Sequence, residues 1–248
     1  MASEKNQSII AIDGPSGTGK STTAKAVAKK LGWTYLDTGA MYRAIAWAIE
    51  NKKKANGQWL VASGKRIKDI LKKTQISFDQ NNRVLINGVI RENEIRDPKI
   101  SEVVSLYSSI PIIRTALTVQ QRKIGSKQPC VLDGRDIGTA VFPKAKYKFF
   151  LIADYKTRAA RRLLELRNAG TAGKETLKSV EKNLRERDEL DSEREIAPLS
   201  RAKDAIEIDT SHLTIQQQVQ RILQSVGEVA RCKVPGTQPQ RSKCPIKR

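Results

Sequence analysis

The feature that most constrains the fold of this chain is a short apolar run followed at once by a glycine-rich segment. Residues 9–12 are apolar, and residues 14–21 read GPSGTGKS, which fits the phosphate-binding pattern GxxxxGK[ST]. In such a P-loop, glycines allow backbone N–H groups to turn toward the phosphates of a nucleotide, and the following helix presents its positive end to them. A glycine-rich turn without a ligand is the alternative, which the position directly after a buried-strand pattern disfavours.

The motif gives specific roles to its residues. Lys20 is predicted to reach the β- and γ-phosphates of a nucleoside triphosphate, and Ser21 to offer its hydroxyl to Mg²⁺ as the metal ligand. The predicted nucleotide-binding residues are Gly14, Pro15, Ser16, Gly17, Thr18, Gly19, Lys20, Ser21 and Thr22. The motif therefore predicts the ligand, but it does not say what the protein does with it.

The rest of the chain alternates strand and helix patterns. Buried strands are predicted at residues 9–12, 34–36, 130–132, 147–152 and 205–208. Helices are predicted at residues 19–31, 41–49, 111–124, 156–168 and 175–190, and a last one at 215–226 after a capping box of Thr214 and Gln217. Gly32 is the expected C-cap of the first helix. This alternation predicts an α/β protein in which helices flank a mostly parallel sheet, as in the P-loop NTPase fold.

One segment, residues 63–103, breaks this alternation. It contains a charged helical pattern, and then short apolar runs around Asn87-Gly88, which is a strong signal for a β-hairpin. We therefore expect a small antiparallel lobe inserted into the main domain. The predicted division is a core of residues 1–62 and 104–226, the inserted lobe of residues 63–103, and a basic, disordered tail of residues 227–248.

The chain is strongly basic, with a formal net charge of +20. Such a charge favours polyanionic ligands, which include nucleic acids, anionic membranes and phosphorylated small molecules. Nucleic acid is not expected, because the basic tail has no aromatic residue that could stack on bases. No membrane is expected either, since apolar runs are short and no secretory signal begins the chain, so a cytoplasmic location is the default. The cysteines form no CxxC pair and the only histidine is His212, so neither a disulfide framework nor a zinc site is predicted.

Several classes of protein share a P-loop. Regulatory GTPases carry an NKxD motif, whereas the only Asn-Lys pair here, Asn51-Lys52, lacks the aspartate. Motor and AAA-type ATPases usually have an apolar run that ends in Asp-Glu, whereas residues 131–136 read VLDGRD. A kinase acting on a small molecule is the first interpretation. Two rivals stay open, namely a kinase with another small phosphate acceptor and a P-loop ATPase that binds nucleic acid.

Arginines near predicted strand ends favour a small-molecule kinase. Arg43 follows the second strand in DTGAMYR, and Arg135 follows the third in DGRD. Because ligands of open α/β sheets bind beyond the carboxyl ends of strands, both loops can meet opposite the P-loop. Arg187, Asp191 and Arg194 are spaced i, i+4, i+7, which places them on one helical stripe. Each arginine alone is more often a solvated surface charge, and their joint placement favours an anion site.

Four segments together give a narrower resemblance. IIAIDGPSGTGKST, YLDTGAMYR, VLDGRDIGTAVFP and ERDELDSEREIAPL, in this order and spacing, are similar to the signatures of bacterial cytidylate kinases, which are P-loop nucleoside monophosphate kinases. The resemblance extends over residues 9–226. It implies an enzyme that uses ATP and Mg²⁺ to phosphorylate CMP or dCMP in pyrimidine nucleotide metabolism. A monomer is expected, although the sequence does not reveal the oligomeric state. The resemblance also implies that the inserted lobe binds the nucleoside monophosphate and that residues 156–190 form a mobile helical lid.

The resemblance implies roles for single residues. The acceptor phosphate would be surrounded by Thr38, Tyr42, Arg43, Arg135 and Arg187. Ser105, Arg114 and Asp136 would read the cytosine edge, and Asp191 with Arg194 would hold the pentose and a nearby phosphate. The lid would direct Arg158, Arg161 and Arg162 at the triphosphate. The implied catalytic cations are Lys20, Arg135, Arg158, Arg162 and Arg187.

Two departures from the family pattern stand out. Thr38 occupies a position where many relatives have serine, which keeps the hydroxyl, and the basic tail has no counterpart. The implied reaction needs no general base, because the attacking oxygen of the acceptor phosphate is already ionised. We therefore expect catalysis to come from in-line positioning and from charge stabilisation by Mg²⁺, Lys20 and the arginines.

Overall fold

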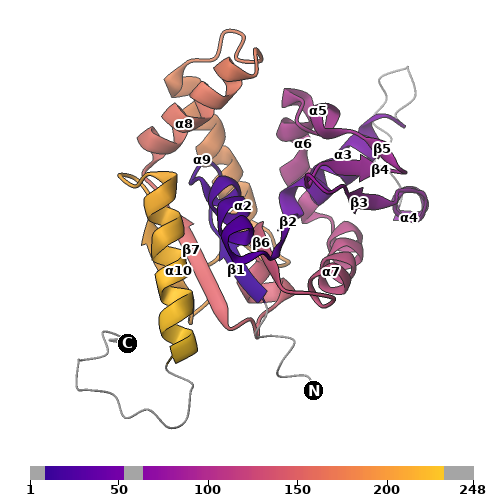
Figure 1. Ribbon diagram of the computed structural model, residues 1–248. Helices are drawn as coiled ribbons and strands as arrows, with labels where there is room; N and C mark the ends of the chain where they lie inside the picture. The colour runs from indigo at the N-terminus through magenta and orange to yellow at the C-terminus, as the bar shows by residue number, and fades with distance from the viewer. Residues whose placement is uncertain (1–8, 53–63, 232–248) are drawn as a thin grey trace.

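Figure 1 shows the computed structural model, which describes residues 9–52 and 64–231 of the chain. Five parallel strands form the central sheet in the order β2-β6-β1-β7-β8. They are β1 (Ile9–Asp13), β2 (Thr34–Asp37), β6 (Cys130–Gly134), β7 (Tyr147–Ile152) and β8 (Ile206–Asp209). The predicted α/β fold with a parallel sheet is confirmed, and every predicted strand is present.

Helices cover both faces of this sheet (Figure 1). One face packs against α2 (Lys20–Leu31) and α10 (Ile215–Arg231), and the other against α3 (Thr38–Glu50) and α7 (Pro111–Gly125). In β1, Ile10 and Ile12 belong to the first core, and Ile9 and Ala11 to the second. All four side chains are fully buried, because β1 is covered on both faces. This burial explains why the sequence reads as a continuous apolar run there.

The sequence signals for helix ends are largely confirmed. Gly32 closes α2 in the left-handed conformation, with a φ of 66°. Thr214 and Gln217 exchange the hydrogen bonds of a capping box at the start of α10. That helix continues to Arg231, past its predicted end at residue 226, and residues 232–248 of the predicted tail lie outside the described residues. Among the described residues, no helix combines the length and hydrophobicity needed to cross a bilayer.

The segment between α3 and α7 contains the predicted antiparallel sheet. Its elements are α4 (Gly64–Lys73), β3 (Ile76–Phe78), β4 (Val84–Ile86), β5 (Val89–Ile90), α5 (Glu92–Ile95) and α6 (Pro98–Ser109). Asn87 and Gly88 have φ values of 52° and 80°, which a two-residue hairpin turn requires, so the predicted hairpin is confirmed. α6 runs through residue 103, where the inserted lobe was expected to end, so that boundary falls inside a helix. The division into domains stays a prediction.

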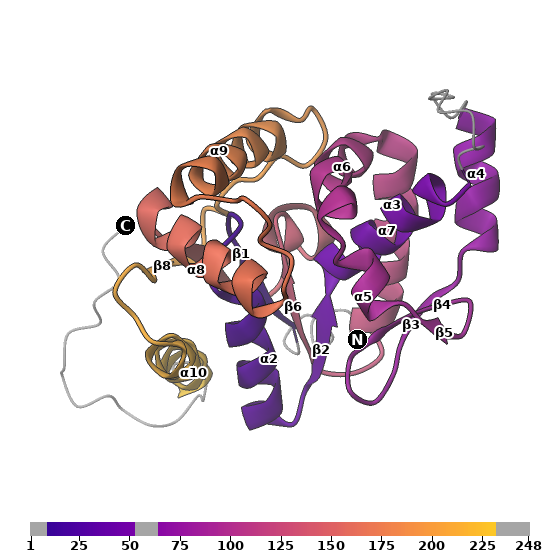
Figure 2. The same cartoon turned by 90° about the horizontal axis from the view of Figure 1, so that it is seen from above.

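Two further helices, α8 (Tyr155–Asn168) and α9 (Leu177–Glu193), form a hairpin with a core of its own. Ala159 and Leu163 of α8 pack there against Val180 and Leu184 of α9. Figure 2 shows this hairpin on one side of the sheet and the α5–α6 segment on the other. The hairpin comprises residues 156–190, which the sequence predicted to form the lid.

A π-helical turn, η2 (Ile137–Val141), follows β6, and no sequence pattern indicated it. Asp13, at the end of β1, accepts hydrogen bonds from the backbone N–H groups of Ile137 and Gly138 at 2.8 and 2.7 Å. Burial raises the pKa of the Asp13 carboxyl to about 7 although these two hydrogen bonds oppose the shift. Asp13 therefore fixes η2 to the end of β1, next to the segment that carries Arg135 and Asp136.

The packing of α7 can be tested with two variants. Leu117 is 0% exposed beneath this helix, whereas Val119 on the same helix is 60% exposed. Leu117→Ala leaves a cavity and should lower the free energy of unfolding by about 2 to 5 kcal/mol. Val119→Ala is the control and should change it by less than about 0.5 kcal/mol. Urea unfolding measures both values, and equal losses would contradict the placement of α7 against the sheet.

Candidate functional site

A cavity of about 870 Å³ lies at the carboxyl ends of the parallel strands, bordered by the P-loop, the inserted segment and α9. It brings together most of the residues that the sequence singled out. Those that line it are Ser16, Gly17, Gly19, Lys20, Ser21, Thr22, Thr38, Tyr42, Arg43, Ser105, Arg114, Arg135, Asp136, Arg162, Arg187, Asp191 and Arg194. Gly14, Pro15, Thr18, Arg158 and Arg161 do not line it.

The P-loop connects β1 to α2 by a turn that only glycine can begin. Gly14, with a φ of 143°, lies directly against the carbonyl oxygen of Leu151 on β7, where a Cβ would have no room. Behind the loop, the Thr18 hydroxyl donates to the carbonyl oxygen of Pro15 at 3.1 Å. These residues shape the loop from outside the cavity. The first turn of α2 has neither a side-chain cap nor an acidic residue, so its N–H groups are available to an anion.

Cationic side chains outnumber carboxylates among the residues that line the cavity. The Lys20 ammonium donates to the carbonyl oxygen of Pro15 at 3.0 Å, and burial together with the neighbouring Arg135 lowers its pKa. The same two causes lower the pKa of Arg187 to about 10. Among the described residues, the Nε atoms of Arg43 and Arg187 are buried without a hydrogen-bond partner. A bound anion would supply both the missing hydrogen bonds and the missing charge.

Ser21 and Asp133 form the part of the site that suits a metal ion. The Ser21 hydroxyl donates to Asp133 Oδ2 at 2.5 Å, and the Tyr35 hydroxyl donates to Oδ1 of the same carboxylate at 2.9 Å. In the part of the chain that the structure describes, no cluster of three metal-binding side chains exists. A hydroxyl and one carboxylate fit Mg²⁺ that arrives with a triphosphate, because Mg²⁺ usually combines few protein oxygens with phosphate and water oxygens. Asp133 received no role from the sequence, although it directly follows a buried apolar run.

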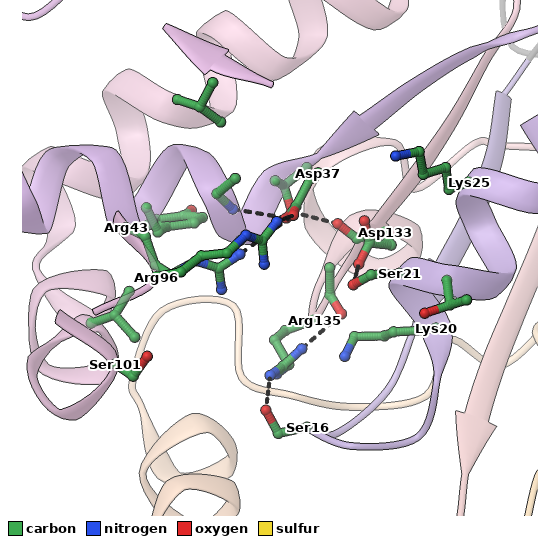
Figure 3. Close-up of a pocket in the computed structure, with 18 of the residues that line it drawn as sticks. Ser16, Lys20, Ser21, Lys25, Asp37, Arg43, Arg96, Ser101, Asp133 and Arg135 are labelled. Atoms are coloured by element: carbon green, nitrogen blue, oxygen red, sulfur yellow. Dashed lines mark hydrogen bonds and ion pairs between the residues drawn. The ribbon is translucent and has the colours of Figure 1, made fainter. Parts of the chain in front are cut away.

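Asp37, the last residue of β2, holds two arginines at the edge of the cavity. Its Oδ2 lies 3.3 Å from Nη2 of Arg43 and 3.5 Å from Nη2 of Arg96. Figure 3 shows both guanidinium groups beside this carboxylate. The sequence did not single out Arg96, since nothing distinguishes it from the other arginines of the inserted segment. The Thr38 hydroxyl, expected at the acceptor phosphate, donates to the backbone carbonyl oxygen of Asp133 at 2.7 Å.

The residues expected to read the base lie together. Asp136 Oδ2 is 2.5 Å from Nη2 of Arg114, and Oδ1 is 3.6 Å from Nη2 of Arg194. All three residues are buried. The Tyr42 ring lies 5.4 Å from the guanidinium carbon of Arg114, and Ser105 lines the same cavity. This arrangement offers a carboxylate and a hydroxyl to a polar ligand edge, with an aromatic ring beside them.

Arg135 connects the P-loop to α9. Its Nε donates to Asp191 Oδ2 at 3.0 Å, and its Nη2 donates to the Ser16 hydroxyl at 3.2 Å. Figure 3 shows its side chain reaching toward Ser16, next to Lys20. Asp191 Oδ1 also lies 3.6 Å from Nη1 of Arg194. Arg187 and Asp191 of α9 therefore lie at the same cavity as the loop after β6 and the P-loop. Arg194 lines it too, but it follows the end of α9 in an extended conformation, so the predicted helical stripe does not include it.

Of the three arginines of α8 that were expected to face the triphosphate, only Arg162 lines the cavity, and the role of all three there stays a prediction. Arg162 lines the cavity and pairs with Glu165 at 3.1 Å. Arg161 instead donates to the carbonyl oxygen of Thr210 at 2.6 Å. Arg158 is buried away from the cavity. The packing of α8 against the core separates them, although their spacing along the helix is that of one face.

The lowered pKa of Lys20 predicts that the protein takes up protons when it binds a nucleotide. A bound polyphosphate stabilises the charged form of its ammonium and reverses the lowering of its pKa. At about pH 8, ATP binding should therefore take up a fraction of a proton, which titration calorimetry in buffers of different ionisation enthalpy measures. Lys20→Met should remove this uptake. Uptake that persists in the variant would assign the proton to another group.

Comparison of the sequence with known proteins matches one family. The family model described as cytidylate kinase matches residues 10–228. The chain is 45% identical over 217 residues to a cytidylate kinase of Caldanaerobacter subterraneus subsp. tengcongensis, covering 88% of this chain and 93% of that protein. It is also 45% identical over 219 residues to a cytidylate kinase of Clostridioides difficile, covering 88% and 97%. A bifunctional pantoate ligase/cytidylate kinase of Prochlorococcus marinus is 45% identical over 233 residues, and there the chain spans only 43% of the relative's length.

Proposed function

Because the chain belongs to the cytidylate kinase family, we propose that it transfers the γ-phosphoryl group of ATP to CMP or dCMP. The observation that carries this proposal is the excess of cations over carboxylates in the lining of the cavity. Lys20 and the start of α2 offer one anion-binding side, and Arg43 with Arg187 offers unpaired donors to a second anion. A donor triphosphate and an acceptor phosphate, bound together, would supply the charge that both sides lack.

In the proposed reaction, an ionised oxygen of the acceptor phosphate attacks the γ-phosphorus of ATP. The bond between this phosphorus and the β,γ-bridging oxygen breaks, and ADP and CDP or dCDP are the products. Lys20, Arg135 and Arg187 would stabilise the charge on the transferring group and on the leaving oxygen. Because the attacking oxygen carries no proton, the absence of a catalytic histidine is no obstacle.

Mg²⁺ would be held by the Ser21 hydroxyl and by Asp133, in company with the phosphates of ATP. The ion neutralises phosphate charge and orients the triphosphate when it is bound. The chain contributes by keeping the carboxylate in place, since Tyr35 donates to it from β2. The hydrogen bond between Ser21 and Asp133 would have to open so that both oxygens could turn to the ion and its water shell.

Asp136 is the best candidate for reading the base. Cytosine presents an amino donor where uracil presents a carbonyl acceptor, so a carboxylate favours the first and repels the second. Asp136 already accepts from Arg114, but its two oxygens together have further acceptor capacity. The arginine therefore orients the carboxylate and leaves it able to bind the base.

The general test is ADP release with ATP and Mg²⁺ and a panel of nucleoside monophosphates. The proposal expects CMP and dCMP to be the best acceptors. Turnover only with another small phosphate acceptor would favour a different kinase, and turnover stimulated by polynucleotides would favour a nucleic-acid-binding ATPase.

Lys20→Ala tests the P-loop assignment in the same assay. The substitution removes a charge from the cavity and nothing from the hydrophobic core, so the fold should survive. Loss of a cation that stabilises the transition state should lower kcat by about 10³ to 10⁵. Circular dichroism confirms folding, and a kcat within about tenfold of the parent would contradict the assignment.

Asp136→Asn tests base reading. An amide can donate as well as accept, so the ratio of kcat/KM for CMP to that for UMP should fall toward one, with a weaker affinity for CMP. Arg135→Ala is the matched comparison, because a cation that contacts phosphate should affect both acceptors similarly. If Asp136 is only an ion-pair partner of Arg114 and Arg194, the substitution should lower kcat/KM equally for both acceptors. An unchanged ratio in Asp136→Asn would therefore refute its reading of cytosine.

A further inference from the structure

Arg158, near the start of α8, bridges the P-loop and α9. Its side chain is only 3% exposed. The Nε atom donates to the backbone carbonyl oxygen of Ser16 at 2.6 Å, and Nη2 lies 2.6 Å from Oδ2 of Asp188 on α9. One guanidinium group therefore connects the main chain of the P-loop to the second helix of the hairpin.

Packing holds Arg158 in this position. Its guanidinium carbon lies 4.7 Å from the centre of the Tyr155 ring, and that of Arg185 on α9 lies 3.8 Å from the same ring. A Cβ on Gly17 would come within 3.1 Å of the Cβ and the carbonyl oxygen of Arg158, so the P-loop and the α8 backbone are in close contact. The start of α8 is thus fixed to the P-loop by main-chain packing as well as by charge.

A second connection between the P-loop and α9 runs through the cavity. It consists of the Ser16 hydroxyl, Arg135 and Asp191, all of which line the cavity. Bound nucleotides would compete for these hydrogen bonds. Arg158 and Asp188 do not line the cavity, so a ligand leaves their connection intact.

Asp188 is next to a residue of the cavity, so its connection to Arg158 can affect the site. Arg187 precedes it on α9, lines the cavity and has an unpaired buried Nε. Fixing Asp188 sets the axial position and the rotation of α9 at this point. Both determine where the Arg187 side chain enters the cavity.

We propose that Arg158 is a positioning residue, which holds α9 against the P-loop through Asp188. It thereby places the Arg187 side chain where it can contact a nucleotide bound at the P-loop. The effect on turnover rests on the proposed kinase activity. Direct contact of Arg158 with the triphosphate is the competing role. It would require the buried pair with Asp188 to separate and would leave the Asp188 carboxylate without its cation.

Two variants weaken the bridge without enlarging any side chain. Asp188→Asn removes the charge, and Arg158→Lys keeps the charge but cannot reach both partners with a planar fork. Each should lower kcat by about 10²-fold, with KM for ATP and CMP within about threefold, because misplacement of a catalytic cation affects the reaction more than binding. The double variant should be no worse than either single one. Glu189→Gln, an exposed neighbour on α9, is the matched control and should leave kcat unchanged.

Two kinetic outcomes would overturn the inference. A raised KM for ATP with kcat preserved would assign Arg158 to direct substrate contact. A lowered melting temperature with kcat preserved in the folded variants would leave it a purely structural role.

Amide hydrogen exchange provides a readout that does not depend on turnover. ATP alone should slow exchange in both α2 and α9 of the parent protein. In Asp188→Asn, protection of α2 should remain while protection of α9 is lost. Protection of α9 that persists in this variant would overturn the inference. A parent protein that phosphorylates no monophosphate would instead refute the proposed function, and the exchange experiment would still decide the role of Arg158.

Discussion

Burying a carboxylate costs free energy unless cations or hydrogen-bond donors surround it. The walls of this cavity contain several buried carboxylates. Asp136 lies between Arg114 of α7 and Arg194 beyond α9, and Asp191 lies between Arg135 and the same Arg194. Except for Asp191 and Arg194, which are neighbours in the sequence, these pairs join different segments of the chain. Separating one of them would leave an uncompensated buried charge, at a cost of about 3 to 5 kcal/mol. The arrangement of helices around the cavity therefore depends on charge pairing as much as on the apolar cores.

Some nitrogen atoms of the cations in the cavity lack a hydrogen-bond partner among the described residues. Lys20 is buried and Arg187 is half-buried near Arg135, which lowers the pKa of each. The Nε atoms of Arg43 and Arg187 have no hydrogen-bond partner in the part of the chain that the structure describes. A protein selected for stability alone would not keep such groups, because each unpaired buried donor costs free energy. They are explained if bound phosphates complete the network. The site is thus preorganised for anions, and the driving force for binding is partly the relief of repulsion among its own cations.

The sequence predicted those features that depend on local pattern. Apolar runs, the P-loop glycines and the Asn87-Gly88 turn specify conformations of neighbouring residues, and all are found. Some features that depend on partners from other segments were missed. The π-helical turn η2 is held by Asp13, whose N–H partners lie more than a hundred residues away in the chain. Helical spacing placed Arg158 correctly on α8, but it could not reveal that Ser16 and Asp188 occupy its guanidinium.

The α8–α9 hairpin is unequally attached to the core along its length, and this limits where it can move. Arg158 is bonded to Ser16, and Arg161 is bonded to Thr210, whose hydroxyl in turn donates to the carbonyl oxygen of Thr18. One residue later, Arg162 pairs only locally with the exposed Glu165, an interaction worth less than about 1 kcal/mol. The buried contacts resist separation far more strongly than this exposed pair. The lid role of the hairpin is a prediction of the family resemblance. If the hairpin closes over a ligand, these contacts predict that the start of α8 stays with the P-loop while the part from Arg162 onward moves.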